Sequence, residues 1–364
     1  MKIMFSVLEV SADIHGAKLI QALKEKRKDL YIYGIGGERM EEEGMELISD
    51  VTQYSTVGYI EPLPYIPKLL DLQKKVRRII KDTKPDLIIF IDAQGFNIPL
   101  AKYVKKLDIP TIYYFSPQYW LFGKKEKAKE MVENLTWIIA TFPQEYEFYK
   151  NFSDNVVFFG HPLIDYLSYL DEVDKEDNLI GIFPGSRIQE IKNLTPIFME
   201  IVDRLYSDGF HFTLPLASNK FSNILLDLVK DKRDKIEVVS GKESQKVLKM
   251  SNLALAASGT VTLEAAILET PVFVFYKISP LSFFMAKRLV HYPYVAIPNI
   301  LGGKMIFPEY VQYIDMDNVI KDIKNFLSDV HKRDEMIKDL KEIVSTLGDH
   351  GVLDRISNFI LSIL

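Results

Sequence analysis

The chain has 364 residues, of which 48% are hydrophobic and 26% are charged, as in an ordinary globular protein. Because a single hydrophobic core usually stops growing below this length, we expect two domains. The net charge of −5 argues against a nucleic-acid partner, and the absence of cysteine excludes disulfides, thiolate metal sites and cysteine nucleophiles. No apolar run approaches the roughly 18 residues of a membrane span, so we expect a soluble protein or one bound to a membrane surface.

Short apolar runs alternate with longer amphipathic stretches in the first half of the chain. This alternation is typical of a parallel sheet covered by helices on both faces. We predict strands at residues 3–8, 30–35, 87–91, 111–115, 137–141 and 156–159. We predict helices at residues 16–26, 69–82, 98–107, 125–134 and 143–150.

The second half repeats this rhythm after a dense run of charges at residues 171–177, which we interpret as a linker; the alternative is a solvated helix end. Strands are predicted at residues 179–183, 211–216, 236–239, 253–257 and 272–276. We therefore expect an N-terminal α/β domain at residues 1–165 and a C-terminal α/β domain at residues 178–340. A last helix at about residues 345–364 would pack back on the first domain. Ligands should bind in a cleft, outside the carboxyl ends of the strands.

Polar residues follow two strands of the first half. Glu9, Ser11 and Asp13 come after the first strand, where they are well placed for a ligand. The alternative is that Ser11 or Asp13 caps the next helix. Asp92 follows the most hydrophobic strand, and incomplete solvation there would raise its pKa and suit it as a general base. A turn or cap aspartate is the alternative.

Three further residues in this half follow strands. Ser116 and Trp120 come after one strand, and Trp120 would stack on a sugar or line a lipid path, or else pack in the core. His161 would bind phosphate or donate a proton, but an ordinary structural histidine is equally consistent with the sequence.

The second half contains two turns suited to anions. In Pro184-Gly-Ser186-Arg187 an arginine at a helix start matches a phosphate bidentately, and Glu190 would hold Arg187 by an ion pair. The alternative is a solvent-facing arginine in the first helical turn. Ser258, Gly259 and Thr260 form a small turn before a helix. Phosphate can approach the exposed N–H groups of such a turn, so the two turns together predict a nucleotide-diphosphate cradle.

Two residues would complete this cradle. Glu264 lies one helical turn beyond Thr260, within reach of the sugar of a nucleotide. Asn299 lies in a stretch rich in proline and glycine that would bring its amide close to a ligand, or that forms a plain turn.

The sequence gives little support for a metal site. Asp315-Met-Asp317 resembles a metal-binding D-x-D motif, but a helix is predicted to follow at once, so we expect Asp315 to cap that helix. The six histidines include no H-x-x-x-H pair. We therefore predict no metal.

One segment has the character of a membrane-surface element. From Tyr59 to Lys81, apolar residues run into a basic helix, which is typical of an element that lies on an anionic bilayer. The alternative is core packing with a solvated basic edge. Residues 281–290 show the same character more weakly.

Taken together in their order along the chain, these motifs resemble those of the lipid-A-disaccharide synthases. The members of that family are inverting GT-B glycosyltransferases at the cytoplasmic face of the Gram-negative inner membrane. The resemblance extends from Glu9 to about Gln312. It implies the GT-B architecture, with two Rossmann-like domains facing a cleft. The donor would be UDP-2,3-diacylglucosamine and the acceptor 2,3-diacylglucosamine 1-phosphate (lipid X). The products would be the β-1,6 disaccharide 1-phosphate and UDP, with no cofactor, and the enzyme would be cytoplasmic and peripheral on the inner membrane.

The resemblance also implies residue roles. Asp92 would be the base that deprotonates the acceptor hydroxyl, and Glu9 would assist or orient. Arg187, with the amides around Ser258, would stabilise charge on the leaving diphosphate, and loss of such a donor costs on the order of 100-fold in rate. Glu264 would bind the ribose hydroxyls. Asn299 would contact the donor near its diphosphate, and Lys277 would contact it where the family has an arginine.

The chain departs from the family pattern around these positions. The departures are Leu8, Ala12, Gln94, Gly95, Gly123 and Lys277. The retained positions are those assigned to chemistry, so we expect the changes to affect recognition of acyl chains or acceptor. Two alternatives remain open: a UDP-sugar 2-epimerase of the same architecture, which needs no acceptor, and a non-catalytic relative that binds lipid or nucleotide.

Overall fold

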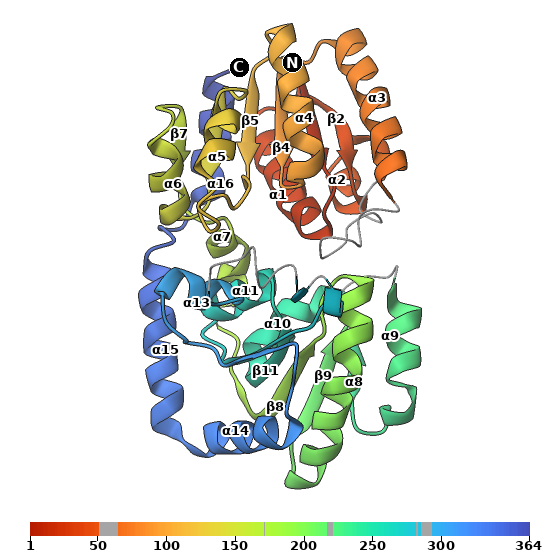
Figure 1. Ribbon diagram of the computed structural model, residues 1–364, viewed down its shortest axis with the longest axis vertical. Coiled ribbons are helices and arrows are strands. Elements are labelled where there is room, and N and C mark those ends of the chain that lie inside the picture. Colours follow the sequence, from red (N-terminus) through yellow and green to blue (C-terminus); the bar gives the residue numbers. More distant parts are fainter. Residues whose placement is uncertain (51–64, 171, 217–220, 282, 285–292) are drawn as a thin grey trace. The chain divides into compact units, whose positions relative to one another are not determined.

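Figure 1 shows the computed structural model, which describes residues 1–50, 65–170, 172–216, 221–281, 283–284 and 293–364. The chain divides into two compact units. The first contains the described residues of Met1–Ser55 and Ile60–Asp165 together with Leu347–Leu364, and the second contains those of Tyr166–Thr346. Each unit is built around one fully parallel sheet.

The first unit has a seven-stranded sheet in the order β3-β2-β1-β4-β5-β6-β7. Its strands are β1 (Lys2–Val7), β2 (Tyr31–Gly36), β3 (Glu46–Asp50), β4 (Leu87–Ile91), β5 (Thr111–Tyr114), β6 (Trp137–Ala140) and β7 (Val156–Phe158). The strand order runs outward from β1 in one direction and from β4 in the other. The sheet therefore has its topological switch point between β1 and β4.

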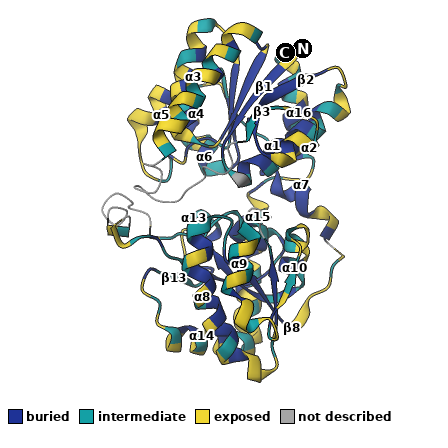
Figure 2. Cartoon of the chain, turned by 90° about the vertical axis from the view of Figure 1, so that its right-hand side faces the viewer, coloured by how far each residue is buried: buried dark blue, intermediate teal, exposed yellow. Residues whose placement is uncertain are grey.

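Helices cover both faces of this sheet. They are α1 (Val10–Lys26), α2 (Glu38–Glu42), α3 (Ile66–Thr83), α4 (Gln94–Val104), α5 (Lys125–Val132), α6 (Pro143–Lys150) and α16 (Val352–Ser362). The short helix α7 (Leu163–Leu167) lies where the chain passes from the first unit to the second. One buried cluster joins α1 and α16 to one face of the sheet, and another joins α3, α4, α5 and α6 to the other face. Apolar side chains therefore point both ways from the central strands, which Figure 2 shows as buried.

The C-terminal helix α16 belongs to the first unit. Its Val352, Ile356 and Ile360 lie in the same buried cluster as α1, and its Phe359 ring packs edge-on against Trp137 with 5.1 Å between centroids. The segment that leads to it is also fixed there, because His161 N donates to the carbonyl of Leu347 at 2.8 Å.

The second unit repeats this plan with a six-stranded sheet in the order β10-β9-β8-β11-β12-β13. Its strands are β8 (Glu176–Phe183), β9 (His211–Pro215), β10 (Glu237–Val239), β11 (Ser251–Ala257), β12 (Val272–Tyr276) and β13 (Glu309–Val311). Its helices include α8 (Ile188–Leu205), α9 (Ser222–Leu228), α10 (Ser244–Met250), α11 (Thr260–Ile267), α13 (Ile297–Gly302), α14 (Met316–Ser328) and α15 (Val330–Ser345). The switch point of this sheet lies between β8 and β11.

Several predicted boundaries are wrong. The helix expected from residue 16 begins at Val10, because the carbonyl of Glu9 already accepts the first helical hydrogen bond from Asp13 N at 3.0 Å. The linker expected at residues 171–177 ends early, since β8 begins at Glu176; Asp171 lies outside the described residues. Asn299 lies in the short helix α13 rather than in a loop.

Candidate active site

The two switch points place the predicted residues on neighbouring strand ends within each unit. In the first unit Val7 pairs with Ile91, so the loop that carries Glu9 and the turn that carries Asp92 are adjacent. The equivalent pair in the second unit is Phe183 and Ala256. The loops that carry Arg187 and Ser258 are adjacent for the same reason. Ligands of open α/β sheets bind at these points.

Asp92 forms a strained turn directly after β4. Its φ of +51° and the φ of +50° at Ala93 put two consecutive non-glycine residues in the left-handed region. The Asp92 carboxylate accepts a hydrogen bond from Ala93 N at 2.8 Å, and the residue is exposed. The expectation that Asp92 lacks full solvation is therefore wrong. An exposed carboxylate at a strand end can still meet a substrate hydroxyl directly, and strain of this kind is concentrated at functional sites.

Glu9 and Ser11 lie at the start of α1, and both are partly exposed. Glu9 occupies the N-cap position with an extended backbone and makes no side-chain cap. Asp13 is buried instead, and its carboxylate accepts hydrogen bonds from Gly37 N at 2.8 Å and Arg39 N at 3.1 Å. Burial raises the pKa of Asp13 although these bonds oppose the shift. Asp13 therefore fixes the start of α2, a role that the sequence did not indicate.

A buried aromatic cluster lies behind these loops. The His15 ring stacks on Phe115 with 4.0 Å between centroids, and His161 contacts Phe115 at 5.6 Å and Phe142 at 5.0 Å. Burial lowers the pKa of His15 to about 3. Burial and the neighbouring His15 lower the pKa of His161 well below its usual value. His161 is buried and its Nδ1 accepts a hydrogen bond from Leu163 N at 3.3 Å, which favours the structural interpretation. The partly exposed Trp120 borders the cluster through Phe142, with 6.1 Å between ring centroids.

Ser116 is held by a carboxylate that was not among the predicted site residues. Its hydroxyl donates to Glu145, which also accepts from Thr141 N at 2.7 Å and Phe142 N at 3.3 Å. Glu145 is buried, and burial raises its pKa. The signal for it was the proline at the first position of α6 followed by a glutamate at the third, Pro143 and Glu145.

The loop after β8 places a guanidinium at the start of α8. The Arg187 side chain forms the predicted ion pair with Glu190, at 2.9 Å from Nη1 to Oε1, so that prediction is confirmed. The other Glu190 oxygen accepts from Ser186 N at 3.1 Å and Arg187 N at 3.3 Å. Gly185 turns the chain with a φ of +104°, where a Cβ would meet the Glu190 carboxylate at 2.3 Å. One glutamate thus shapes the whole turn.

The turn after β11 is open above its glycine. A Cβ at Gly259 would meet no atom within 4 Å, so backbone is accessible there. Ser258 N donates to Phe275 O at 3.2 Å, and the Ser258 hydroxyl donates to Val295 O at 2.6 Å. The helix α11 begins at Thr260. An accessible helix start of this kind suits a phosphate.

Glu264 and Lys277 flank this turn. Glu264 lies in α11, and its Oε1 accepts from Gln245 Nε2 at 3.0 Å. Gln245 in turn accepts from the Tyr169 hydroxyl at 3.2 Å. This chain of bonds orients the Glu264 carboxylate, and no sequence pattern singled out Gln245. Lys277 follows β12 and is half-buried.

Asn299 is fully buried and its amide is saturated by the protein. Its Nδ2 donates to Phe307 O at 2.7 Å and Glu309 Oε1 at 2.8 Å, and its Oδ1 accepts from Ile306 N at 2.9 Å and Phe307 N at 2.8 Å. Glu309 also accepts from Ala296 N at 2.8 Å. This geometry corrects the predicted contact between Asn299 and a donor: the residue holds a loop.

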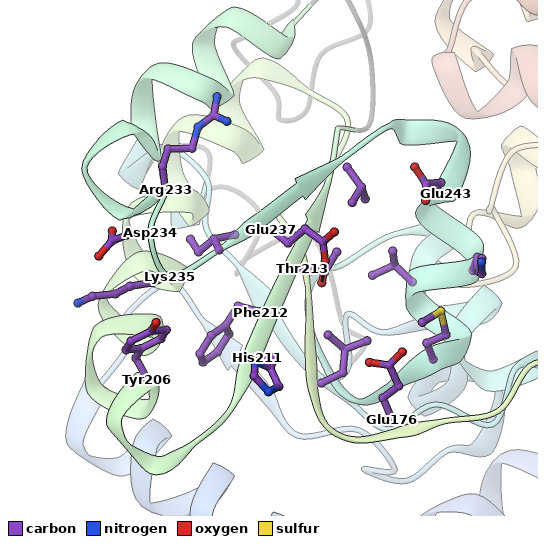
Figure 3. Close-up of a pocket in the computed structure, with 16 residues that line it drawn as sticks. Glu176, Tyr206, His211, Phe212, Thr213, Arg233, Asp234, Lys235, Glu237 and Glu243 are labelled. Carbon is purple, nitrogen blue, oxygen red and sulfur yellow. Dashed lines mark hydrogen bonds between the residues drawn. The ribbon is translucent and has the colours of Figure 1, made fainter.

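A hollow in the second unit lies away from these loops. Figure 3 shows it around Glu176, His211 and Glu237, with a volume of about 540 Å³. These residues begin β8, β9 and β10, whereas Arg187 and Ser258 follow the carboxyl ends of β8 and β11. Neither Arg187 nor Ser258 lines the hollow, which extends along the β10 edge of the sheet.

Asp315 caps α14, accepting from Asp317 N at 3.1 Å and Asn318 N at 3.3 Å, so the predicted cap is confirmed. Within the described ranges, no three side chains of histidine, aspartate or glutamate group together as a metal site. Across the same part of the chain, none of the helices has the length and apolarity that a bilayer crossing demands.

Comparison with known proteins decides the family. The family model described as lipid-A-disaccharide synthetase matches residues 3–353. The chain belongs to this family. A lipid-A-disaccharide synthase of Sulfurihydrogenibium sp. is 34% identical over 390 residues, covering 100% of this chain and 98% of the relative. One of Francisella philomiragia is 33% identical, covering 95% and 94%. The resemblance found in the sequence is thus confirmed, and the family makes the chain a glycosyltransferase.

Solved structures confirm the predicted GT-B architecture of two Rossmann-like domains. The S. aureus MnaA–UDP co-structure has a TM-score of 0.66 at 16% identity, covering 100% of this chain and 98% of that one. A Methanocaldococcus jannaschii UDP-GlcNAc 2-epimerase in complex with UDP-GlcNAc and UDP has a TM-score of 0.63 at 13% identity, covering both chains fully. At these identities the likeness concerns the fold alone. It does not favour an epimerase over the lipid-A-disaccharide synthetase family.

Proposed function

We propose that this glycosyltransferase moves 2,3-diacylglucosamine from its UDP donor to 2,3-diacylglucosamine 1-phosphate. The products are the β-1,6-linked disaccharide 1-phosphate and UDP. Family membership supports the substrates. The residues at the two switch points support a catalytic first unit and a donor-binding second unit. Carboxylates follow β1 and β4, whereas a guanidinium and an open helix start follow β8 and β11.

The second unit binds the donor. Arg187, fixed by Glu190, and the N–H groups at the start of α11 neutralise the diphosphate. Glu264, oriented by Gln245, accepts hydrogen bonds from the ribose hydroxyls. Lys277 contributes a further positive charge near this edge of the sheet. UDP in solved structures of the same fold supports a uridine nucleotide as the ligand.

The first unit binds the acceptor and supplies the base. The Asp92 carboxylate takes the proton of the acceptor 6-hydroxyl as that oxygen bonds to the anomeric carbon of the donor sugar. The bond from that carbon to the diphosphate oxygen breaks, and its electron pair leaves with UDP. Attack opposite the leaving group inverts the anomeric centre. Arg187 stabilises the charge that grows on the diphosphate, and Glu9 lies on the strand end next to Asp92 to orient the acceptor.

The first unit also meets the membrane. On α3 the apolar Ile66 and Leu70 are 42% and 54% exposed, and the basic Lys74 and Arg78 continue at the same four-residue spacing. Such a stripe suits the surface of an anionic bilayer. The predicted segment from Tyr59 to Pro64, and residues 282 and 285–290 of the second stretch, lie outside the described residues. The enzyme would act at the cytoplasmic face of the inner membrane.

Acceptor dependence tests this function. In detergent, with acylated UDP-glucosamine as donor, UDP release should require a labelled lipid X analogue, and the label should appear in a disaccharide. The rate should be unchanged by a chelator. Turnover of UDP-N-acetylglucosamine alone would indicate an epimerase, and UDP binding without transfer would indicate a non-catalytic relative. Either result would overturn the proposal.

A further inference from the structure

The backbone of Asp92 is held in its strained conformation by side chains from two neighbouring elements and by a backbone bond. Two consecutive residues with positive φ cost free energy, so such a turn persists only where its surroundings fix it. Asp92 N donates to the carbonyl of Phe115 at 3.3 Å, just beyond β5. The carbonyl of Asp92 accepts hydrogen bonds from two buried side chains, Asn97 on α4 and Tyr113 on β5.

Asn97 is fully buried in the first turns of α4. Its Nδ2 donates to Asp92 O at 2.9 Å and to Ser6 O at 3.2 Å, and lies 3.4 Å from Ile91 O. Its Oδ1 accepts from the Ser6 hydroxyl at 2.6 Å. The amide therefore ties the turn after β4 to β1, the strand on the other side of the switch point, and its orientation is set by Ser6.

Tyr113 approaches the same carbonyl from β5. Its hydroxyl donates to Asp92 O at 2.6 Å, and the side chain has no exposed surface. Burial raises the pKa of Tyr113 well above its usual value, so the hydroxyl keeps its proton and remains a donor. Asp92 O thus accepts a short bond from the Tyr113 hydroxyl and a second bond from the Asn97 amide.

We propose that Asn97 and Tyr113 are positioning residues: they lock the Asp92 backbone in the left-handed conformation and thereby aim its carboxylate outward at the acceptor hydroxyl. This inference rests on the proposed role of Asp92 as the base. Neither side chain touches substrate, because both are buried. A residue that only stabilised the fold would change the free energy of unfolding without a selective effect on the chemical step.

The variant Tyr113→Phe tests this with least disturbance, since it keeps the ring and removes one hydrogen bond. We expect kcat to fall on the order of 10- to 100-fold, as for a misplaced catalytic group, while KM for both substrates stays within about twofold. Tyr33→Phe is the matched control. Tyr33 lies in the same buried cluster, and its hydroxyl bonds Thr83 Oγ1 at 2.5 Å, away from Asp92. It should lose similar stability and keep kcat.

Coupling to Asp92 separates this inference from the proposed function. In the Asp92→Asn background, adding Tyr113→Phe should cause no further fall in kcat, because the base is already absent. An equal fall in both backgrounds, or a fall no larger than in Tyr33→Phe, would overturn the positioning role. Full turnover of Asp92→Asn alone would instead overturn the base.

A second variant guards against failure to fold. Ala93→Gly suits a φ of +50° better than alanine does, so it should not destabilise the protein. With glycine at position 93 the left-handed turn costs less free energy, so the turn depends less on the hydrogen bonds to the Asp92 carbonyl. We expect Tyr113→Phe to lower kcat less in the Ala93→Gly background than in the wild type, at an unchanged or higher thermal midpoint. An equal fall in kcat in both backgrounds would contradict the need for a locked turn.

Discussion

The buried carboxylate of Glu145 is predicted to be among the most important single side chains for the stability of the first unit. It is 2% exposed and accepts hydrogen bonds from two backbone N–H groups, those of Thr141 and Phe142, and from the hydroxyls of Thr141 and Ser116. It thereby joins the ends of β5 and β6 at the edge where the acceptor is proposed to bind. Glu145→Ala removes all four acceptor contacts at once.

The magnitude follows from the groups left without partners. A buried donor that loses its acceptor costs about 1–3 kcal/mol, and loss of a helix cap costs about 1 kcal/mol. The two hydroxyls can rotate to other acceptors, so the two N–H groups dominate. We expect Glu145→Ala to lower the free energy of unfolding by about 3 kcal/mol, a large part of the roughly 5–15 kcal/mol typical of a domain. At a urea m-value of about 2 kcal/mol/M, the midpoint falls by about 1.5 M.

Urea unfolding followed by tryptophan fluorescence measures this shift in the unfolding midpoint of the first unit, because the only two tryptophans, Trp120 and Trp137, both lie there. Glu147→Ala is the matched control: the same residue type on the same helix, but exposed, with an expected effect below about 0.5 kcal/mol. Equal midpoints for Glu145→Ala and Glu147→Ala would refute the argument that the buried hydrogen bonds stabilise this edge.

Three further predictions concern charge and the membrane. Glu145→Gln keeps the shape of the side chain but cannot take up a proton. Because burial raises the pKa of Glu145 in the folded state above its ordinary value of about 4.5, the wild type should gain stability over this variant as the pH falls toward 4.5. Urea unfolding of both proteins at pH 7 and pH 4.5 measures this gain, and an equal difference in unfolding free energy at the two pH values would contradict the prediction. Arg187→Lys lowers kcat on the order of 100-fold through loss of the fork geometry, measured by steady-state transfer, and wild-type kcat would disprove it. Leu70→Glu should weaken flotation of the protein with anionic vesicles while transfer in detergent persists. The control is Tyr31→Glu, which changes an exposed aromatic residue on β2, and equal flotation of both variants would exclude α3 as the membrane-binding element.

Strands buried on both faces were predictable because their signal is local. β4 is an unbroken apolar run, Leu87–Ile91, and it was predicted to the residue. β3 was missed because it is an edge strand, with only intermediate or exposed residues and an acid at each end. The helix predicted from residue 16 begins six residues earlier, and Gly16 lies inside α1, where a Cβ would meet Met40 Sδ at 2.6 Å.

The partners of individual polar groups were not predictable. The position of Asp92 after β4 could be inferred, but its positive φ is imposed by Asn97 and Tyr113 through tertiary hydrogen bonds. Asn299 looked available for a ligand because nothing in its sequence neighbourhood shows that Glu309 and the backbone at residues 306–307 occupy its amide. The local hydrophobic pattern therefore predicted where the strands end. It did not predict which polar groups form hydrogen bonds within the protein and are unavailable to a ligand.

The proposed mechanism requires Asp92 as the base, and the transfer rate of Asp92→Asn tests this role directly. The control is Asp108→Asn, which changes another aspartate with a positive φ, +54°, outside the proposed site. We expect Asp92→Asn to lower kcat on the order of 10²- to 10⁴-fold while UDP still binds, and Asp108→Asn to transfer at the wild-type rate. Equal and undiminished transfer by both variants would contradict the role of Asp92 as the base.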